Sequence, residues 1–194
     1  MDETLIRKVL MDLERHGADH DAQETDHARK MLNLEPDTAH LIHILIRSSG
    51  CRNLLEIGTS NGYSTIWLAW AAEATNGHVT SLDRSPDKHQ LADANLRRAG
   101  LRERVDLRTG DATEIVRELA GPFDLVFFDA DRLSAPGQLA LLLPKLVSGA
   151  LVLADNVTSH PQEIKAYLAA VQAHPRLDHM VIPVGKGLSL AYWV

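Results

Sequence analysis

Short apolar runs alternate with longer amphipathic stretches from residue 52 onward, and this alternation restricts the fold more than any other feature of the sequence. The apolar runs cover residues 53–57, 78–83, 104–108, 123–129 and 150–154. Helical patterns begin between them, near residues 64, 86, 111 and 137. Strands that alternate with helices form a parallel sheet with right-handed crossovers. The sequence therefore predicts an α/β core.

The alternation ends after one further helix, which the pattern predicts over residues 161–173. Two strand-like runs, 179–184 and 188–194, are then separated only by Gly185-Lys186-Gly187. A three-residue link that contains glycine joins antiparallel strands in a hairpin and is too short for a crossover. We expect a mostly parallel, seven-stranded sheet that ends in an antiparallel hairpin.

The first 50 residues are expected to form a cap of N-terminal helices over this core, within a single domain of residues 1–194 whose α/β part covers 51–194. An apolar stripe over residues 2–16 predicts the first helix, which Gly17 is expected to end. Asp37 can cap a second helix, and Gly50 closes it.

Three histidines, His16, His20 and His27, lie in or after the first predicted helix. Imidazoles are common metal ligands, so a metal cluster is one interpretation. A solvated, charged face is the interpretation that this polar stretch favours.

Composition and charge exclude several classes of protein. The net charge of −6 argues against a nucleic-acid partner held through phosphate contacts. The longest apolar runs are too short to span a membrane, and the N-terminus lacks the pattern of a secretory signal. Cys51 is the one cysteine, which rules out an internal disulfide and makes a cytoplasmic location the simplest expectation. We interpret Cys51 as a small buried residue, because no activating partner lies beside it in the sequence.

Acidic side chains stand at the ends of the predicted parallel strands. Glu56 and Asp83 close the first two strands, and Asp129, Asp131 and Asp155 follow later ones. Ligands bind outside the carboxyl ends of the strands in an open α/β sheet, so these residues are considered together. Carboxylates that crowd at one edge repel one another unless a positive group lies between them.

The loop after the first strand narrows the choice of cofactor. Its glycines, Gly58 and Gly62, do not have the G-x-G-x-x-G spacing of a dinucleotide site. Asp83 suits a ribose, because one carboxylate can accept from both hydroxyls. Asp111 is well explained as a helix cap, and the Asp111-Ala112 pair would lie beside the next part of the ligand, an adenine. A ribose and a base without a pyrophosphate indicate S-adenosylmethionine (SAM).

Six segments carry a resemblance to a known family: LEIGT (55–59), GYS (62–64), GDA (110–112), FDLVFFDAD (123–131), ADNV (154–157) and PVGKGL (183–188). The chain resembles the cation-dependent class I O-methyltransferases, the group of caffeoyl-CoA and catechol O-methyltransferases, and particularly their short bacterial members. The similarity extends from about residue 31 to residue 194. It implies a Rossmann-like class I methyltransferase fold, a homodimer, and SAM-dependent methylation of a hydroxyl on a small phenolic or catechol-like acceptor.

The resemblance also implies roles for individual residues. The cofactor site would comprise Leu34, Glu56, Gly58, Thr59, Ser60, Ser64, Asp83, Asp111, Ala112 and Asp129. A divalent cation would be bound by Asp129, Asp155 and Asn156. Three oxygen ligands suit Mg²⁺ first, or Mn²⁺ or Ca²⁺, and do not suit a metal that prefers thiols.

The sequence departs from the family after the first metal aspartate. The family has Asp-Ala-Asp-Lys-x-x-Tyr there, with the lysine as general base, whereas Arg132 takes the lysine position here and the tyrosine is absent. Arginine stays protonated and cannot be that base, so Arg132 either orients an anionic group or is a surface residue. Asp131 and His160 are the remaining candidates for a proton acceptor, although His160 is also explained as a loop histidine before Pro161.

Alternatives follow from this departure. One is a SAM methyltransferase whose acceptor is an amine, an acid or a natural-product intermediate. Another is a SAM-binding protein of low activity, which the retained metal set disfavours. A dehydrogenase that uses NAD is disfavoured by the glycine spacing and by the terminal hairpin.

Overall fold

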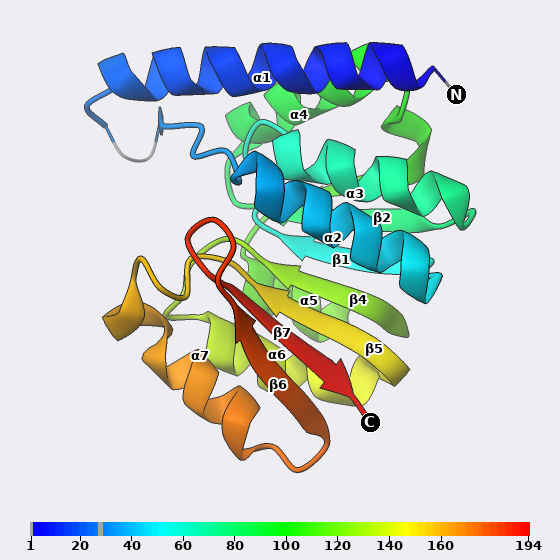
Figure 1. Cartoon of the computed structure of the whole chain (residues 1–194), viewed down its shortest axis with the longest axis vertical. Coiled ribbons are helices and arrows are strands. Elements are labelled where there is room, and N and C mark those ends of the chain that lie inside the picture. Colours follow the sequence, from blue (N-terminus) through cyan, green and yellow to red (C-terminus); the bar gives the residue numbers. More distant parts are fainter. Residues whose placement is uncertain (1, 27–28) are drawn as a thin grey trace.

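The computed structural model describes residues 2–26 and 29–194, and its strands form one seven-stranded sheet in the order β3-β2-β1-β4-β5-β7-β6 (Figure 1). The strands are β1 (Asn53–Ile57), β2 (His78–Asp83), β3 (Val105–Thr109), β4 (Phe123–Phe128), β5 (Leu146–Ala154), β6 (Leu177–Ile182) and β7 (Leu188–Trp193). The first five strands are parallel to one another, and β7 is antiparallel to both β5 and β6. The predicted parallel sheet and its terminal hairpin are therefore confirmed.

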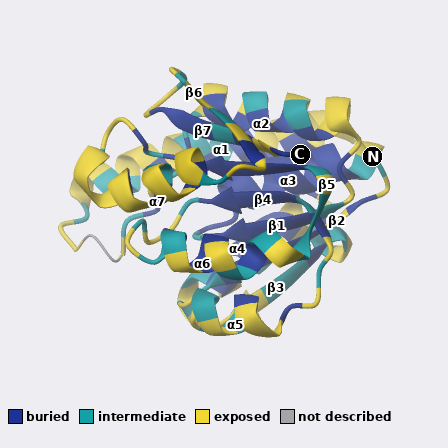
Figure 2. Cartoon of the chain, turned by 90° about the horizontal axis from the view of Figure 1, so that it is seen from below, coloured by how far each residue is buried: buried dark blue, intermediate teal, exposed yellow. Residues whose placement is uncertain are grey.

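Helices cover both faces of the sheet. One layer contains α1 (Glu3–Gln23), α2 (Pro36–Ser49), α3 (Tyr63–Ala74) and α4 (Pro86–Arg98). The other layer contains α5 (Ala112–Glu118), α6 (Ala135–Leu142) and α7 (Pro161–Ala173). The central strands β1 and β4 are mostly buried, whereas the edge strands β3 and β6 and the outer faces of helices such as α1 and α7 are more exposed (Figure 2). Parallel sheets require this double cover, and it explains why the strands read as nearly continuous apolar runs.

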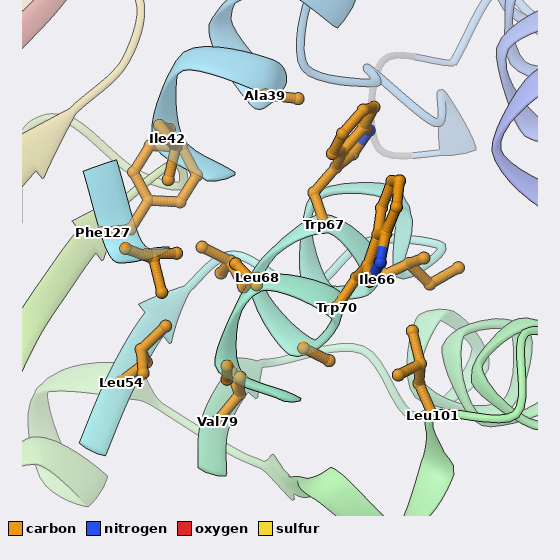
Figure 3. Packing of buried hydrophobic residues seen from close by; sticks show 14 of the residues in the cluster. Ala39, Ile42, Leu54, Ile66, Trp67, Leu68, Trp70, Val79, Leu101 and Phe127 are labelled. Carbon is orange, nitrogen blue, oxygen red and sulfur yellow. The ribbon is translucent and has the colours of Figure 1, made fainter. Parts of the chain in front are cut away.

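Alternate residues along each strand supply two separate cores. Leu54 and Phe127 face the layer of α2 and α3, where they pack near Ile42, Leu68 and other buried side chains (Figure 3). Their neighbours on the same strands, such as Leu55 and Phe128, face the other layer. This follows from the two-residue period of a strand.

Helix α3 is the most deeply buried helix of the described chain. Its residues from Tyr63 to Ala72 are all buried, because the sheet lies on one side and α1 and α2 lie on the other. Tyr63 also donates a hydrogen bond of 2.6 Å to Glu14 of α1. The first two helices therefore complete the cover of the helix that follows the first strand.

Two expectations for the N-terminal helices are wrong. The first helix does not end at Gly17 but continues to Gln23. Gly17 is needed there for packing, because an added Cβ would lie 2.5 Å from Nδ2 of Asn33, which donates to the Leu13 carbonyl. The second helix begins at Pro36, and Asp37 lies in its first turn without capping it. Gly50 does close that helix, with φ at 69°.

The observed boundaries of several strands differ from the predicted ones by a few residues. The strand predicted from 104 begins at Val105, β5 begins at Leu146 rather than 150, and β6 begins at Leu177 rather than 179.

His27 lies outside the described residues, and the centroids of the His16 and His20 rings are 6.2 Å apart. Among the described residues, no helix has the length and apolar character needed to cross a membrane.

Gly77, between α3 and β2, provides a test of the close packing at the start of the sheet. An added Cβ would lie 2.6 Å from the carbonyl oxygen of Arg52, which is backbone and cannot move aside. Gly77→Ala should therefore lower the free energy of unfolding by about 1–3 kcal/mol in urea denaturation.

Gly137→Ala is the matched control, because nothing lies within 4 Å of the added Cβ and the residue is inside α6. This variant should be neutral or more stable by up to about 1 kcal/mol. Equal unfolding midpoints for the two variants would contradict the packing at Gly77.

Candidate active site

The carboxyl ends of β1 and β4 meet through a backbone contact. Gly58 has φ at 115°, and a Cβ on this residue would overlap the carbonyl oxygen of Asp129. The Asp129 amide donates to the Ile57 carbonyl at 2.9 Å, and the Gly58 amide donates to the Leu82 carbonyl at 2.9 Å. Only glycine fits here, and it brings the loop after β1 directly against the first residue of the predicted metal set.

Glu56 is completely buried at the end of β1. Its carboxylate accepts hydrogen bonds from the hydroxyls of Ser64 at 2.6 Å, Thr65 and Ser81. Burial raises the pKa of Glu56 to about 7, although these hydroxyls oppose the shift. No cation pairs with this carboxylate in the described part of the chain, so a positively charged ligand group would be favoured beside it.

A second chain of polar contacts holds the loop residue Thr59. Its hydroxyl lies 2.6 Å from Oγ of Ser81 and 3.1 Å from Nε2 of His89. The other ring nitrogen of His89 contacts the hydroxyl of Thr109. Burial lowers the pKa of His89, which keeps the ring neutral within this network. The Thr59 side chain therefore points into the protein and positions the loop backbone.

Asp83 is held by the backbone of two loops. Its carboxylate accepts from the amides of Ser60 and Ser85, each at 2.9 Å. The Ser60 hydroxyl donates to the Met31 carbonyl at 2.7 Å, so this side chain anchors the segment that leads into α2. Asp83 is thus fixed beside the glycine loop, and its role at the cofactor site stays a prediction.

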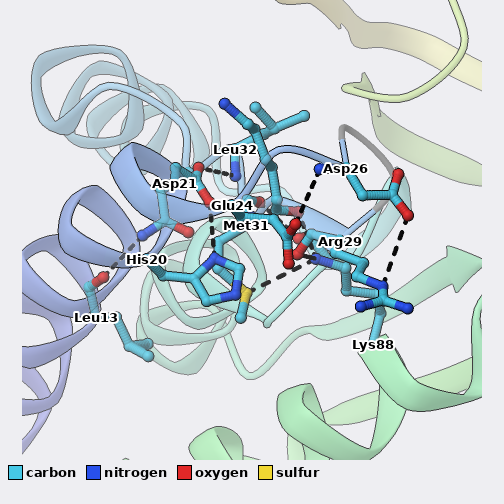
Figure 4. A network of polar contacts seen from close by, with 12 residues as sticks. Leu13, His20, Asp21, Glu24, Asp26, Arg29, Met31, Leu32 and Lys88 are labelled. Carbon is cyan, nitrogen blue, oxygen red and sulfur yellow. Dashed lines mark hydrogen bonds and ion pairs between the residues drawn. The ribbon is translucent and has the colours of Figure 1, made fainter.

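The segment before α2 is also attached to α1 and α4 by a polar network (Figure 4). Asp21 accepts from the amides of Met31 at 2.6 Å and Leu32 at 2.8 Å. Lys88, at the start of α4, donates to the backbone carbonyls of Arg29, at 3.3 Å, and Lys30. Leu34, a predicted cofactor contact, is buried in the core shared by α2 and α3.

Asp111 caps α5, as its alternative interpretation predicted. Its carboxylate accepts from the amides of Thr113 at 2.9 Å and Glu114 at 3.1 Å. Ala112 is the first residue of that helix and is partly buried. The predicted place of Ala112 beside an adenine stays a prediction.

The predicted metal ligands come together at the ends of β4 and β5. Nδ2 of Asn156 lies 3.3 Å from Oδ1 of Asp129, and Asn156 has the unusual φ of 65°. Asp155 is only 3% exposed, and its Oδ1 has no hydrogen-bond partner among the described residues. A cavity of about 10 Å³, large enough for a water-sized group, lies against all three side chains.

Electrostatics at this edge also favour a cation. Burial raises the pKa of Asp155 to about 6, with a further contribution from Glu35. Burial and the charge of Asp155 raise the pKa of Asp129 well above its usual range. Among the described residues no group of three or more His, Cys, Asp or Glu side chains could hold a metal, but the predicted set has two carboxylates and one amide oxygen. A hard divalent cation fits these oxygen donors.

The three candidates for the acceptor side have partners of their own. Asp131 accepts from the hydroxyl of Ser134 and the Leu133 amide, and these hydrogen bonds lower its pKa, which makes it a weak proton acceptor. Arg132 pairs with Glu163 of α7 at 2.8 Å. His160 precedes α7, and its Nδ1 lies 2.8 Å from the Ser159 hydroxyl. Their catalytic roles stay predictions.

Sequence reasoning missed a pair of charges next to the metal set. Nζ of Lys186, in the β6–β7 loop, lies 2.6 Å from Oε1 of Glu35, which precedes α2. One signal for Lys186 was available, because β6 runs parallel to β5 and ends at the same edge of the sheet. Glu35 gave no such signal, since its contact joins distant parts of the sequence. Thr65, Ser81 and His89 were missed for the same reason.

Comparison with known proteins identifies the family. The O-methyltransferase family model matches residues 8–194, and the chain belongs to this family. A catechol O-methyltransferase of Niastella koreensis is 39% identical over 132 residues, which are 65% of this chain and 58% of that protein. A catechol O-methyltransferase of Mycobacterium tuberculosis is 42% identical over 107 residues, 55% of this chain and 48% of that protein. The chain thus spans about half the length of these curated relatives.

A solved structure extends the match to nearly the whole chain. The O-methyltransferase from Bacillus cereus, in complex with SAH, superposes with a TM-score of 0.82 and 28% identity, covering 96% of this chain and 91% of that one. The fold predicted from the strand pattern is therefore that of class I methyltransferases.

Glu56 makes a testable contribution to stability as pH changes. Its carboxyl ionises near pH 4.5 in the unfolded chain and near pH 7 in the folded protein. The unfolded state therefore gains charge first, and the free energy of unfolding should fall by about 2–3 kcal/mol as pH rises through this range. Glu56→Gln removes this titration, so its free energy of unfolding should fall less between pH 4.5 and pH 7 in urea denaturation.

Glu118→Gln, at the exposed end of α5, is the matched control and should follow the wild-type pH dependence. Parallel pH dependences for wild type and the Glu56 variant would show that Glu56 is not shifted.

Proposed function

We propose that the chain is a SAM-dependent O-methyltransferase that methylates a hydroxyl of a small phenolic or catechol-like acceptor with the help of a divalent cation. One observation carries this proposal: the glycine loop after β1 contacts the backbone of Asp129, the first residue of the oxygen-donor set. A cofactor on that loop and an acceptor at that set would be neighbours.

Glu56 and Asp83 would divide recognition of the cofactor between them. The buried Glu56 carboxylate lacks a cationic partner in the described chain and suits the amino group of the methionine part. Asp83, fixed by two backbone amides, suits the ribose hydroxyls. The loop from Gly58 to Ser64 would approach the methionine part, and Ala112 would border the adenine. Binding therefore orients the methyl donor toward the ends of β4 and β5.

Asp129, Asp155 and Asn156 would hold the cation, with Mg²⁺ as the first choice. The orphaned Oδ1 of Asp155 and the raised pKa values of both carboxyls support this assignment. A bound divalent cation lowers the pKa of a coordinated hydroxyl from a phenol's usual value of about 10. The role of the chain itself is to orient both reactants, which alone can lower a barrier by several kcal/mol.

An acceptor other than a catechol is the second candidate. The specific observation is Arg132, which stands where the family has its lysine base and which pairs with Glu163. Methylation of an amine, an acid or a natural-product intermediate would differ from methylation of a catechol in its requirement for a general base. A SAM-binding protein of low activity is disfavoured, because a pure binder has no use for the oxygen-donor set.

Further properties belong to the same proposal. We infer a single domain in which residues 1–50 cap the core of residues 51–194, and a homodimer in which the cap takes part. Leu5, Met11 and Ile44 of α1 and α2 expose large apolar side chains, which supports such a contact. The net charge of −6 disfavours a nucleic-acid partner, and the single cysteine favours a cytoplasmic location.

Asp155→Ala tests the role of the cation. The variant should lose methyl transfer to a catechol acceptor by about 100-fold or more, because a cation contributes several kcal/mol, while calorimetry still detects SAM binding. Asp178→Ala, at an exposed position of β6, is the matched control and should keep wild-type activity.

Two results would contradict the proposal in different ways. If wild-type turnover survives complete chelation of divalent cations, the proposed role of the cation in catalysis is refuted. Failure of the wild-type protein to bind SAM would remove the methyltransferase assignment itself.

Arg132→Lys tests the second candidate. If the chain lacks only the family's base, the variant should methylate catechol about tenfold faster than wild type at pH 8, since general bases contribute at least that much. Arg132→Gln should show no gain. Unchanged or slower turnover of the lysine variant would mean that Arg132 has its own role at the site.

A further inference from the structure

The β6–β7 loop is fixed against the metal-binding edge by its backbone. The Val157 amide donates to the Gly187 carbonyl at 3.1 Å, and the Thr158 amide donates to the Lys186 carbonyl at 3.0 Å. The Thr158 hydroxyl also donates to the Lys186 carbonyl, at 2.6 Å. Residues 157 and 158 directly follow Asn156, so the Lys186 backbone is positioned by the segment that carries two predicted cation ligands.

The same loop is packed against the residues before and in α2. A Cβ on Gly185 would overlap Oγ1 of Thr38 and lie 3.0 Å from Oε2 of Glu35. In Figure 1 this red loop lies beside the start of α2 at the end of the sheet. Neither Gly185 nor Gly187 leaves room for a side chain, so Lys186 is the one residue of the link that projects a functional group.

Glu35 holds the Lys186 ammonium group. Their 2.6 Å ion pair uses one of three N–H donors of the lysine, and the Lys186 side chain is 48% exposed. Burial lowers the pKa of Lys186, but the bond to Glu35 and the charges of Glu35, Asp155 and Asp129 outweigh this and raise it. Lys186 thus stays a cation with donors available to a ligand from solvent.

Lys186 is one of two cations whose charges act on Asp155 at this edge, and Arg132 is the other. Arg132 is engaged by Glu163, and the family's lysine is absent from position 132. Oδ1 of Asp155, Oε2 of Glu35 and Oγ1 of Thr38 are buried without hydrogen-bond partners among the described residues. An anionic oxygen brought to this edge would meet repelling carboxylates. The charge of Lys186 acts on both Asp129 and Asp155, so this lysine can offset them.

We propose that Lys186, held by Glu35, stabilises negative charge on the acceptor oxygen at the edge formed by Asp129, Asp155 and Asn156. This inference rests on the proposed methyltransferase function. It makes Lys186 an electrostatic catalytic residue and selects acceptors that react as oxyanions. Lys186 does not act as the base, because it remains protonated, and the acceptor proton leaves to solvent or to another group.

The test compares Lys186→Met with Lys165→Met, a matched control at an exposed position of α7. Methyl transfer from SAM to catechol is measured with saturating Mg²⁺. Lys186→Met should lower kcat about tenfold, between the small effect of an exposed ion pair and the larger effect of a buried oxyanion donor. The calorimetric Kd for SAM should change less than twofold, and Lys186→Arg should restore kcat to within about threefold of wild type.

The Mg²⁺ requirement gives a second readout that a structural role would not move in the same direction. Removing a positive charge near Asp129 and Asp155 should lower the Mg²⁺ concentration for half-maximal activity about twofold, even as kcat falls. Lys186→Gln is measured in parallel, so that a folding failure of the methionine variant does not decide the question.

Three outcomes are separable. Equal kcat for Lys186→Met, Lys186→Gln and the Lys165 control overturns the inference and leaves the proposed function intact. Loss of SAM binding together with kcat overturns it in favour of a structural role. Absence of methyl transfer by the wild-type protein to any phenolic acceptor removes the proposed function on which the inference rests.

Discussion

The contact between Gly58 and the Asp129 backbone is the constraint on which the rest of the site depends. Strands β1 and β4 are neighbours at the centre of the sheet, and the amide of Asp129 continues their ladder by donating to Ile57. A side chain at position 58 would push the two strand ends apart. Because the contact is made by backbone atoms, it fixes the loop after β1 relative to Asp129. A fixed geometry of this kind favours transfer between two bound molecules.

Buried negative charge around this contact is not fully balanced by nearby positive side chains of the described residues. Glu56, Asp129 and Asp155 are buried carboxylates, and burial raises the pKa of each of them. An apolar replacement would make a more stable protein, since buried charges without partners are costly. The cost is explained if ligands supply the missing positive charge: an amino group for Glu56 and a divalent cation for the two aspartates. In the proposal made above, Lys186, the cation held by Glu35, would face the acceptor.

The sequence predicts the framework well because its signals are local. Alternating patterns placed the parallel strands, the short Gly185–Gly187 link required a hairpin, and the acids at strand ends meet at one edge. Its failures involve contacts between distant segments. Gly17 looked like a helix end, but it makes room for Asn33. The hydroxyls around Glu56, the His89 support of Thr59 and the Glu35–Lys186 pair depend on tertiary packing that no local pattern specifies. The resemblance supplied the proposed metal ligands, whereas the partner of Arg132 is seen only in the structure.

The most direct test of the account is the position of a cation in crystals grown with SAM and Mn²⁺. Anomalous difference density should show one ion bound by carboxylate oxygens of Asp129 and Asp155 and by the amide oxygen of Asn156, at about 2.0–2.6 Å. The orphaned Oδ1 of Asp155 should be among its ligands. The absence of an ion at this edge, with SAM bound on the loop after β1, would contradict the account.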